Sequence, residues 1–223
     1  VKFSENGPFD FGRNIWLPVD SIDFDVQFFP EGGALLSGVN QNVAFKAIGK
    51  DGLSVDIEGE VCNSKGETLY HFVSIHAGMG SFALNVVPGE TYYANIKVKG
   101  FEQVKRFELP KVEESGIALS VTQRYDKNQL IYSIKCANGA PLPKGLKLVA
   151  HTRGIPMVSK EIDETIASGI LMTDNMYEGI LHLSLMDSDC NVLSERLCFI
   201  RHADTKSMTI TPNKKKYSVR DEV

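Results

Sequence analysis

Alternation of apolar and polar residues is the strongest pattern in this sequence. In "IDFDVQFF" (residues 22–29) apolar and polar side chains alternate from Ile22 to Phe28. A period of two places the two kinds of side chain on opposite faces of a β-strand. Similar segments separated by turn-forming residues predict further strands at 42–49, 55–62, 67–75, 81–87, 91–98 and 103–110. Short strands at intervals of roughly 8–12 residues are typical of an antiparallel sandwich or barrel.

The second half of the chain repeats this pattern. It predicts strands at 116–124, 129–136, 145–154, 155–163, 178–187 and 192–201, and a last one at 207–212 that closes the domain or leads into the next. The segment nearest to helical periodicity is 160–172, but Gly169 and several β-branched residues weaken it as a helix. The sequence therefore predicts a nearly all-β protein.

The length and the turn signals predict two domains. A chain of 223 residues suits one large domain or two of about 100 residues each. The boundary is expected in "LPKVEESG" (residues 109–116), which combines a proline, two glutamates and a glycine. We therefore predict an N-terminal extended arm at 1–21, a first β-sandwich at 22–112, a second at 113–211, and the start of a following domain at 212–223. The arm is expected to pack Phe9, Phe11 and Trp16 onto a sandwich.

Composition and charge narrow the function classes. Apolar residues make up 43% and charged residues 23%, which is ordinary for a globular protein. The net charge of −4 argues against a nucleic-acid partner, because phosphate binding needs a basic surface. No stretch approaches the roughly 20 apolar residues of a membrane helix. The ends of the sequence, "VKF" and "YSVRDEV", lead us to expect a piece of a longer protein.

The four cysteines show no metal-binding or redox spacing. No CxxC pair connects Cys62, Cys136, Cys190 and Cys198. All but Cys190 lie in apolar runs, where a free thiol behaves as a small hydrophobic side chain. Buried free thiols are therefore favoured over disulfides, although the pattern does not exclude a disulfide.

Several segments resemble a known family. "DVQFFPEGG", "VAFKAIGKDGLSVDIEGEV" and "HAGMGSFALNVVPGETYYANI" in the first half resemble macroglobulin-like domains, the β-sandwich modules of the alpha-2-macroglobulin and complement superfamily. In the second half "LVAHTRGIP", "EGILHLSLMDSDCNVLSERLCFI" and "PNKKKYSVRDEV" match the same family. The likeness covers residues 22–223 and is greatest to tandem-domain surface proteins of Gram-negative bacteria.

This resemblance implies two tandem antiparallel immunoglobulin-like or macroglobulin-like β-sandwich domains. It also implies an extracytoplasmic location, in the periplasm or at the cell surface in association with the outer membrane. Members that trap proteases carry a thioester in a Cys-Gly-Glu-Gln motif, which this sequence lacks, since Cys136 precedes Ala-Asn-Gly. Trapping chemistry is therefore not expected in this chain.

Two glycine-containing segments are candidate ligand loops. Gly32 and Gly33 follow Pro30, but the chain continues as a strand, whereas a phosphate-binding loop needs a helix N-terminus behind it. We therefore interpret the glycine pair as a turn. In "HAGMG" (residues 76–80) the glycines are expected to shape a hairpin and Met79 to cap the core, in preference to a functional role for the histidine.

The histidines give no clear metal site. His71 and His76 are five residues apart, which places them on opposite faces of a strand and prevents them from easily sharing one metal ion. Nothing in the sequence brings His151, His182 and His202 together. A metal site built from these histidines is therefore not predicted.

The acidic pairs and the lysine run have ordinary structural interpretations. "DSDCN" (residues 187–191) offers oxygen ligands for Ca²⁺, but Val192 stands where an EF-hand loop has glycine, so a turn is favoured. Asp23 and Asp25 share one strand face and are expected to face solvent. There is no Gly-x-Ser-x-Gly nucleophile motif, and the lysine run at 213–217 is expected to be solvated. We therefore predict no catalytic, cofactor-binding or metal site.

The function predicted from these observations is non-catalytic. We expect a scaffold or interaction module of a larger bacterial surface protein, whose partners are the other domains of that protein and another surface protein or a glycan. The alternative is a glycan- or peptide-binding module with an exposed aromatic platform drawn from Tyr92, Tyr93, Phe101 and Trp16. An enzyme is the third and least favoured hypothesis. Contacts are expected at domain ends and strand edges, because open sandwiches expose unpaired backbone groups there.

Overall fold

A computed structural model of the chain describes residues 22–202 together with residues 208, 209, 211, 214, 216 and 219. The predicted arm at 1–21, including Trp16, lies outside the described residues, and so does most of the segment 212–223. The described residues form β-strands and two single-turn 3₁₀ helices, η1 (Tyr125–Lys127) and η2 (Ala137–Gly139). Within this part of the chain no helix has the length and apolar content needed to cross a membrane. The predicted all-β class is confirmed.

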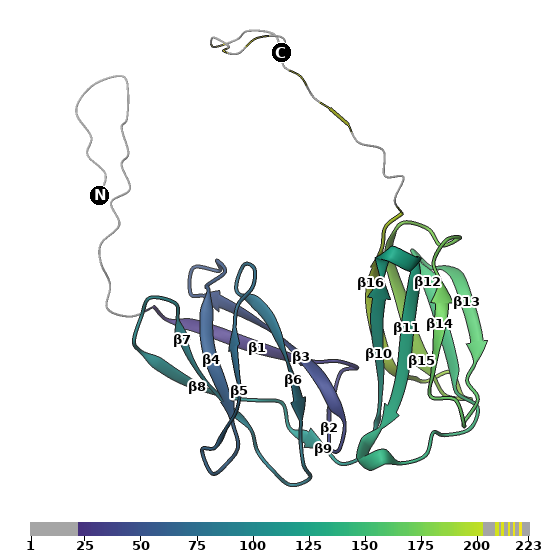
Figure 1. Cartoon of the computed structure of the whole chain (residues 1–223), viewed down its shortest axis with the longest axis horizontal. Helices are drawn as coiled ribbons and strands as arrows, with labels where there is room; N and C mark the ends of the chain where they lie inside the picture. The colour runs from purple at the N-terminus through teal and green to yellow at the C-terminus, as the bar shows by residue number, and fades with distance from the viewer. Residues whose placement is uncertain are drawn as a thin grey trace.

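The first β-sandwich is formed by a three-stranded and a four-stranded antiparallel sheet (Figure 1). The three-stranded sheet has the order β1-β3-β6 and the four-stranded sheet the order β5-β4-β7-β8. The bounds are β1 (Phe24–Pro30), β3 (Asn40–Gly49), β4 (Ile57–Cys62), β5 (Thr68–Val73), β6 (Met79–Asn85), β7 (Tyr93–Val98) and β8 (Val104–Glu108). In β3, buried and exposed side chains alternate almost without exception, as the period of two predicts.

The second β-sandwich repeats this topology. Its sheets have the orders β10-β11-β14 and β13-β12-β15-β16. Its strands are β10 (Ile117–Arg124), β11 (Gln129–Cys136), β12 (Lys147–Thr152), β13 (Ile155–Glu161), β14 (Ser168–Met172), β15 (Gly179–Met186) and β16 (Val192–Ile200). In both sandwiches the smaller sheet holds the first, second and fifth of the seven strands. The predicted antiparallel β-sandwich fold is therefore confirmed.

A short parallel pair lies where the two sandwiches meet (Figure 1). It joins β2 (Leu35–Leu36) to β9 (Val112–Glu113). Neither strand is predicted by the period of two, because each has only two residues. The pair connects the loop after β1 to the segment that leads into the second sandwich.

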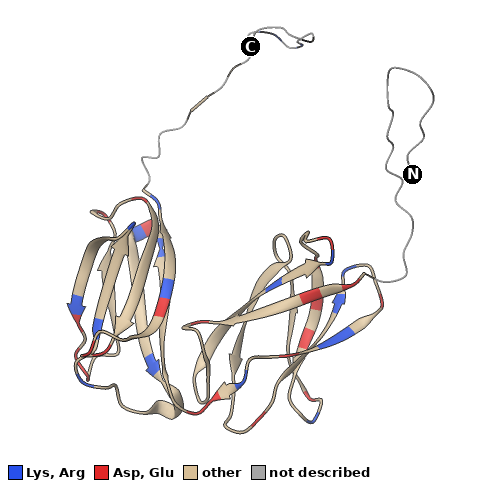
Figure 2. Cartoon of the chain, turned by 180° about the vertical axis from the view of Figure 1, so that it is seen from behind, with Lys and Arg blue, Asp and Glu red and all other residues tan. Residues whose placement is uncertain are grey.

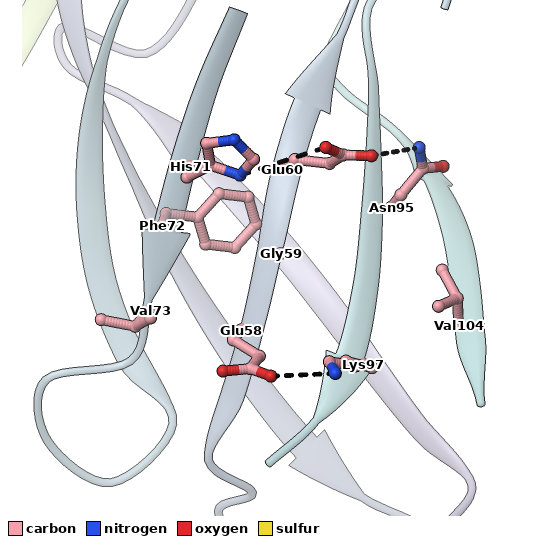
Figure 3. A pocket seen from close by; sticks show the side chains of 9 residues that line it. All are labelled: Glu58, Gly59, Glu60, His71, Phe72, Val73, Asn95, Lys97 and Val104. Carbon is pink, nitrogen blue, oxygen red and sulfur yellow. Dashed lines mark hydrogen bonds and ion pairs between the residues drawn. The ribbon is translucent and has the colours of Figure 1, made fainter. Parts of the chain in front are cut away.

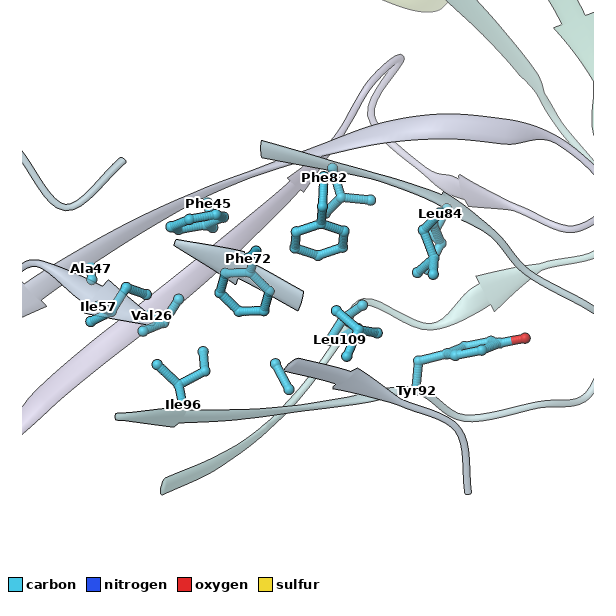
Figure 4. Packing of buried hydrophobic residues seen from close by; sticks show 14 of the residues in the cluster. Val26, Phe45, Ala47, Ile57, Phe72, Phe82, Leu84, Tyr92, Ile96 and Leu109 are labelled. Carbon is cyan, nitrogen blue, oxygen red and sulfur yellow. The ribbon is translucent and has the colours of Figure 1, made fainter. Parts of the chain in front are cut away.

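The first core is centred on three phenylalanines. The ring centroids of Phe45 and Phe72 are 4.9 Å apart and those of Phe72 and Phe82 are 5.1 Å apart, and Figure 4 shows the three rings packed between the two sheets. Aromatic pairs at this spacing add to the stabilisation from buried area. The buried members of this cluster are Phe24, Val26, Leu35, Val43, Phe45, Ala47, Ile57, Val61, Phe72, Phe82, Leu84, Val86, Tyr92, Ala94, Ile96, Val98, Leu109 and Val112.

The second core is mostly aliphatic and contains one buried tyrosine. A Cβ atom added at Gly169 would lie 2.4 Å from the hydroxyl oxygen of Tyr132, so the tyrosine requires glycine at this position of β14. The buried members are Leu119, Leu130, Tyr132, Ile134, Leu146, Leu148, Ala150, Ile162, Leu171, Met176, Leu181, Leu183, Leu185 and Ile200. The two cores thus take their residues from 24–112 and from 119–200, while the exact domain boundaries stay predictions.

Three local expectations differ from the structure. The sequence predicts no strand between 163 and 178, yet Ser168–Met172 forms β14, because pairing with β11 outweighs the low strand propensity of Gly169. Met79 is 43% exposed, so it does not cap the core. The strand expected at 207–212 is not formed by Met208, Thr209 or Thr211, the residues of that segment that the structure describes.

All four cysteines are free thiols, as favoured from the sequence. Cys62 and Cys136 are buried, Cys198 is half-buried and Cys190 is exposed. Burial raises the pKa of the Cys136 and Cys198 thiols above the ordinary value, because the thiolate is poorly solvated. Both thiols are therefore held in the neutral form and behave as packing residues.

Candidate functional site

The outer face of the sheet β5-β4-β7-β8 carries a shallow depression of about 370 Å³ that is open to solvent. Strand register places side chains of the four strands in rows across this face. The two central rows are Val73, Glu58, Lys97 and Val104, and then His71, Glu60, Asn95 and Arg106. Figure 3 shows the residues that line the depression, with Val73 and Val104 at its two sides. We call this surface the outer face.

Polar groups on the outer face are paired with one another. The Lys97 Nζ lies 3.2 Å from Glu58 Oε1, and the pKa of Lys97 is raised, mainly by its hydrogen bond to Glu58. The amide of Asn95 donates a hydrogen bond of 3.2 Å to Glu60, and the hydroxyl of Thr68 donates another of 2.9 Å. These two bonds lower the pKa of Glu60, with Asn95 as the larger cause. Both shifts favour the charged forms of the side chains.

The floor of the depression depends on a glycine in the middle of β4. A Cβ atom at Gly59 would lie 2.6 Å from the carbonyl oxygen of Asn95 and 3.0 Å from the Phe72 ring. The absence of that atom allows the Phe72 ring to lie against the strand, and both Gly59 and Phe72 line the depression. A general acid at neutral pH needs a carboxyl with a raised pKa, and Glu60 shows the opposite shift. The amide, carboxylate and ammonium groups that line the depression can each form hydrogen bonds with a polar ligand.

The predicted aromatic platform is not formed by the described residues. Tyr92 is only 4% exposed and its hydroxyl accepts a hydrogen bond of 3.0 Å from the Val87 amide, so its expected exposure is wrong. Phe101 is half-buried against the first core. Tyr93 is half-buried too, and the Arg106 guanidinium lies 3.7 Å from its ring centroid. Trp16 lies outside the described residues. Sequence alternation alone does not distinguish Tyr92 from Tyr93 as the inward-facing residue, because either could start the strand.

His151 and His182 lie together, which the sequence does not predict. They are directly opposite each other on β12 and β15, with ring centroids 4.9 Å apart. His182 Nε2 lies 2.8 Å from Glu195 Oε1. His202 is elsewhere and its ring is 2.8 Å from the carbonyl of Met176. In the part of the chain that the structure describes, no three potential ligands are arranged to hold a metal ion.

The acidic turn and the glycine pair have the structures expected of turns. The Asp187 carboxylate accepts hydrogen bonds from the amides of Asp189 (2.9 Å) and Asn191 (2.8 Å), and the Asn191 side chain is the first cause of its lowered pKa. Gly32 and Gly33 have φ angles of 90° and 99°, and the Gly33 amide donates to the Pro30 carbonyl. Both segments are therefore turns, as predicted.

The loop from Glu31 to Val39 also attaches the first sandwich to the second. The sequence does not reveal this second role. The buried carboxylate of Glu31 lies 3.2 Å from Arg196 Nη2 of β16 and accepts a hydrogen bond of 3.3 Å from the Val121 amide of β10. The Ser194 hydroxyl donates to the Gly32 carbonyl (3.0 Å) and accepts from the Leu119 amide (2.9 Å). We call this set of contacts the joint.

The other end of the loop completes the joint. The Asn138 amide donates to the Ser37 carbonyl at 2.7 Å, and the Ser37 hydroxyl donates to the Asn138 side chain at 3.0 Å. A small apolar cluster lies between the sandwiches and consists of Leu36, Val39, Ala118 and Ala137, with Ala34 against it. Apolar packing, hydrogen bonds and one ion pair therefore act together to fix the two sandwiches to each other. The sequence feature that corresponds to this contact between the sandwiches is the apolar pair Leu35–Leu36 within the loop.

Comparison with known proteins gives a loose structural resemblance. No family model and no curated protein matches the chain. Among solved structures, the BSP domain of a biofilm-associated protein gives a TM-score of 0.35 at 14% identity, over 81% of this chain and 30% of that chain. The native conformation of alpha-2-macroglobulin from E. coli gives 0.30 at 15% identity, over 83% and 15%. The central fibronectin-III array of RIM-binding protein gives 0.27 at 8% identity, over 84% and 90%.

These matches concern the fold alone. The macroglobulin resemblance expected from the sequence is therefore supported only as a weak likeness in fold, and membership in that family stays a proposal. The chain spans less than a third of the length of the biofilm-associated and macroglobulin structures.

Proposed function

We propose that this chain is a non-catalytic scaffold and interaction module, and that it belongs to a larger extracytoplasmic protein of a Gram-negative bacterium. The observation that carries the proposal is the joint. A loop of one sandwich is hydrogen-bonded, ion-paired and packed against the next, which gives a tandem unit of fixed geometry. Fixed spacing between surfaces is what a scaffold requires, whereas an enzyme requires a site with poised ionisable groups.

The outer face supports the same interpretation. Two of its ionisable groups are held in their charged forms by their neighbours, because the pKa of Glu60 is lowered and that of Lys97 is raised. Acidic and basic residues are interspersed along the strands and loops of both sandwiches (Figure 2). A mixed surface of this kind suits contact with protein or carbohydrate better than contact with nucleic acid.

The location is tested by protease accessibility in the source bacterium. An antibody raised against the purified chain follows the parent protein in intact cells, in cells with a permeabilised outer membrane, and in lysed cells. We expect added protease to degrade the protein in the first or second condition. Protection until the inner membrane is broken would contradict an extracytoplasmic role. A cytoplasmic marker protein serves as the control for leakage.

The outer face also favours a second candidate function, the binding of a glycan or peptide. The depression offers an amide, a carboxylate and an imidazole side by side in Asn95, Glu60 and His71 (Figure 3). Chemical-shift titration with oligosaccharides and short peptides tests this function, with Asn95→Ala as the binding variant. Asn128→Ala in the second sandwich is the matched control, because its amide likewise donates to a carboxylate, that of Asp174. Equal shifts in both variants would exclude the outer face as the binding site.

A further inference from the structure

Strand β5 is an edge strand with an unusually apolar composition. It pairs with β4 on one side and with no second strand among the described residues. Its sequence, TLYHFV, contains no lysine, arginine, carboxylate or proline. Leu69 and Val73 on the outer face are 45% and 59% exposed, and Tyr70 is 42% exposed. Unpaired backbone groups next to exposed apolar side chains form a template for another strand.

Two other edge strands of this chain, β13 and β8, carry features that discourage pairing. On β13 a register shift lies between Ala150 and His151 of its partner, and the strand itself contains Pro156 and Lys160. On β8, Lys105 forms an ion pair with Asp23 and thereby ties this edge to the start of β1. Charges, proline and bulges are the usual protection of sheet edges. Strand β5 contains no lysine, arginine, carboxylate or proline within its six residues. Its pairing with β4 shifts register only between Val61 and Cys62, where Leu69 has no partner, and residues 70–73 pair without interruption.

The side chains of β5 are complementary to a second copy of the same strand. In antiparallel pairing, directly opposite side chains lie on the same face, so only registers that join residues of the same face are allowed. One such register places His71 opposite its own counterpart and Leu69 opposite Val73 of the second copy, twice by symmetry. It brings apolar side chains together and places no two carboxylates or lysines of the strands opposite each other, which favours association.

We propose that two copies of this chain associate through β5 in this antiparallel register. The four-stranded sheets of the two copies then join into one continuous sheet across a two-fold axis. The depressions on the two outer faces, each lined by His71 and Val73 of β5, become neighbours on the same side of that sheet. The association does not depend on the cellular role proposed above.

Charge variants test the interface and its register together. Sedimentation equilibrium from low micromolar to several hundred micromolar protein measures the dissociation constant. Leu69→Lys/Val73→Lys places like charges opposite each other, and we expect it to weaken association by about tenfold or more. Leu69→Lys/Val73→Glu places opposite charges in the same pairs and should restore association. Ile170→Lys/Met172→Lys on the edge strand β14, where the side chains are 53% and 55% exposed, is the control and should leave the constant unchanged.

A cross-linking experiment fixes the register independently. In a Cys190→Ser background, which removes the exposed thiol, His71→Cys should form a disulfide-linked dimer on mild oxidation, because opposite residues of antiparallel strands have suitable Cα separations. Leu69→Cys should not, since the two copies of residue 69 lie four positions apart along the strands. A monomer at every concentration, a dimer insensitive to the β5 charge variants, or failure of the Lys/Glu combination to restore association would each overturn the proposal.

Discussion

Gly32 and Gly33 differ in their surroundings although both have positive φ. A Cβ at Gly32 would lie 2.8 Å from the Cβ of Ala118, whereas a Cβ at Gly33 would meet nothing within 4 Å. Both Gly→Ala changes incur the strain of a left-handed backbone, about 1 kcal/mol, but Gly32→Ala must in addition push the sandwiches apart. We expect urea unfolding to show a clearly larger loss of stability for Gly32→Ala. Equal losses would mean that Ala118 does not restrict this position.

Asp23 predicts a dependence of stability on acidic pH. Hydrogen bonds from Lys105 and then Lys50 lower the pKa of Asp23 to about 2 from an ordinary value of 3.8. A carboxyl with a depressed pKa in the folded state contributes stability above its unfolded pKa and loses it as pH falls through the folded one. The melting temperature of the native chain should therefore exceed that of Asp23→Asn at neutral pH and low salt.

The difference in melting temperature between the native chain and Asp23→Asn should shrink between about pH 4 and pH 2. This interval lies between the ordinary pKa of Asp23 and its lowered pKa in the folded chain. It should also shrink at high salt, because this ion pair is exposed to solvent. Asp25→Asn is the matched control on the same strand face. A difference that persists unchanged at pH 2 would contradict the role of the ion pair.

At the scale of elements, the loop from Glu31 to Val39 depends on one buried amide. The Gln41 side chain accepts a hydrogen bond from the Leu36 amide at 2.7 Å and donates to the carbonyls of Glu31 (2.8 Å) and Ala34 (2.9 Å). Gln41→Met keeps the volume but leaves these backbone groups unpaired, which should cost about 1–3 kcal/mol. Equilibrium unfolding measures this loss, and Asn40→Met at the exposed neighbouring position should change stability little.

The same loop shows how far the sequence predicts this structure. The alternation of apolar and polar residues indicates which face of a strand is buried. It therefore predicts most of the strands and the all-β fold class. It carries no information on which non-consecutive strands pair, and the meeting of His151 with His182 across β12 and β15 is therefore missed. The turn at Gly32 is predicted from backbone chemistry, but its contact with Ser194 joins residues 162 positions apart and leaves no local signal.

At the scale of the whole molecule, the joint determines whether the two sandwiches act as one body. The loop of the first sandwich contacts β10 and β16 of the second, the first and last strands of that sandwich. β10 belongs to the three-stranded sheet and β16 to the four-stranded sheet, so the loop contacts both sheets of the second sandwich. The orientation of the outer face relative to the second sandwich is therefore coupled to the integrity of both cores.

The ion pair between Glu31 and Arg196 provides the test of this coupling. Arg196→Met leaves the buried Glu31 carboxylate without its cation and should destabilise the chain by about 2 kcal/mol. Breaking a fully buried ion pair costs roughly 3–5 kcal/mol, and the loss here is smaller because the arginine side chain is 33% exposed. Small-angle scattering should show an increased radius of gyration as the joint loosens. Adding Glu31→Gln removes the unpaired charge and should recover part of the lost stability, whereas additive losses in the double variant would show that the two side chains act independently.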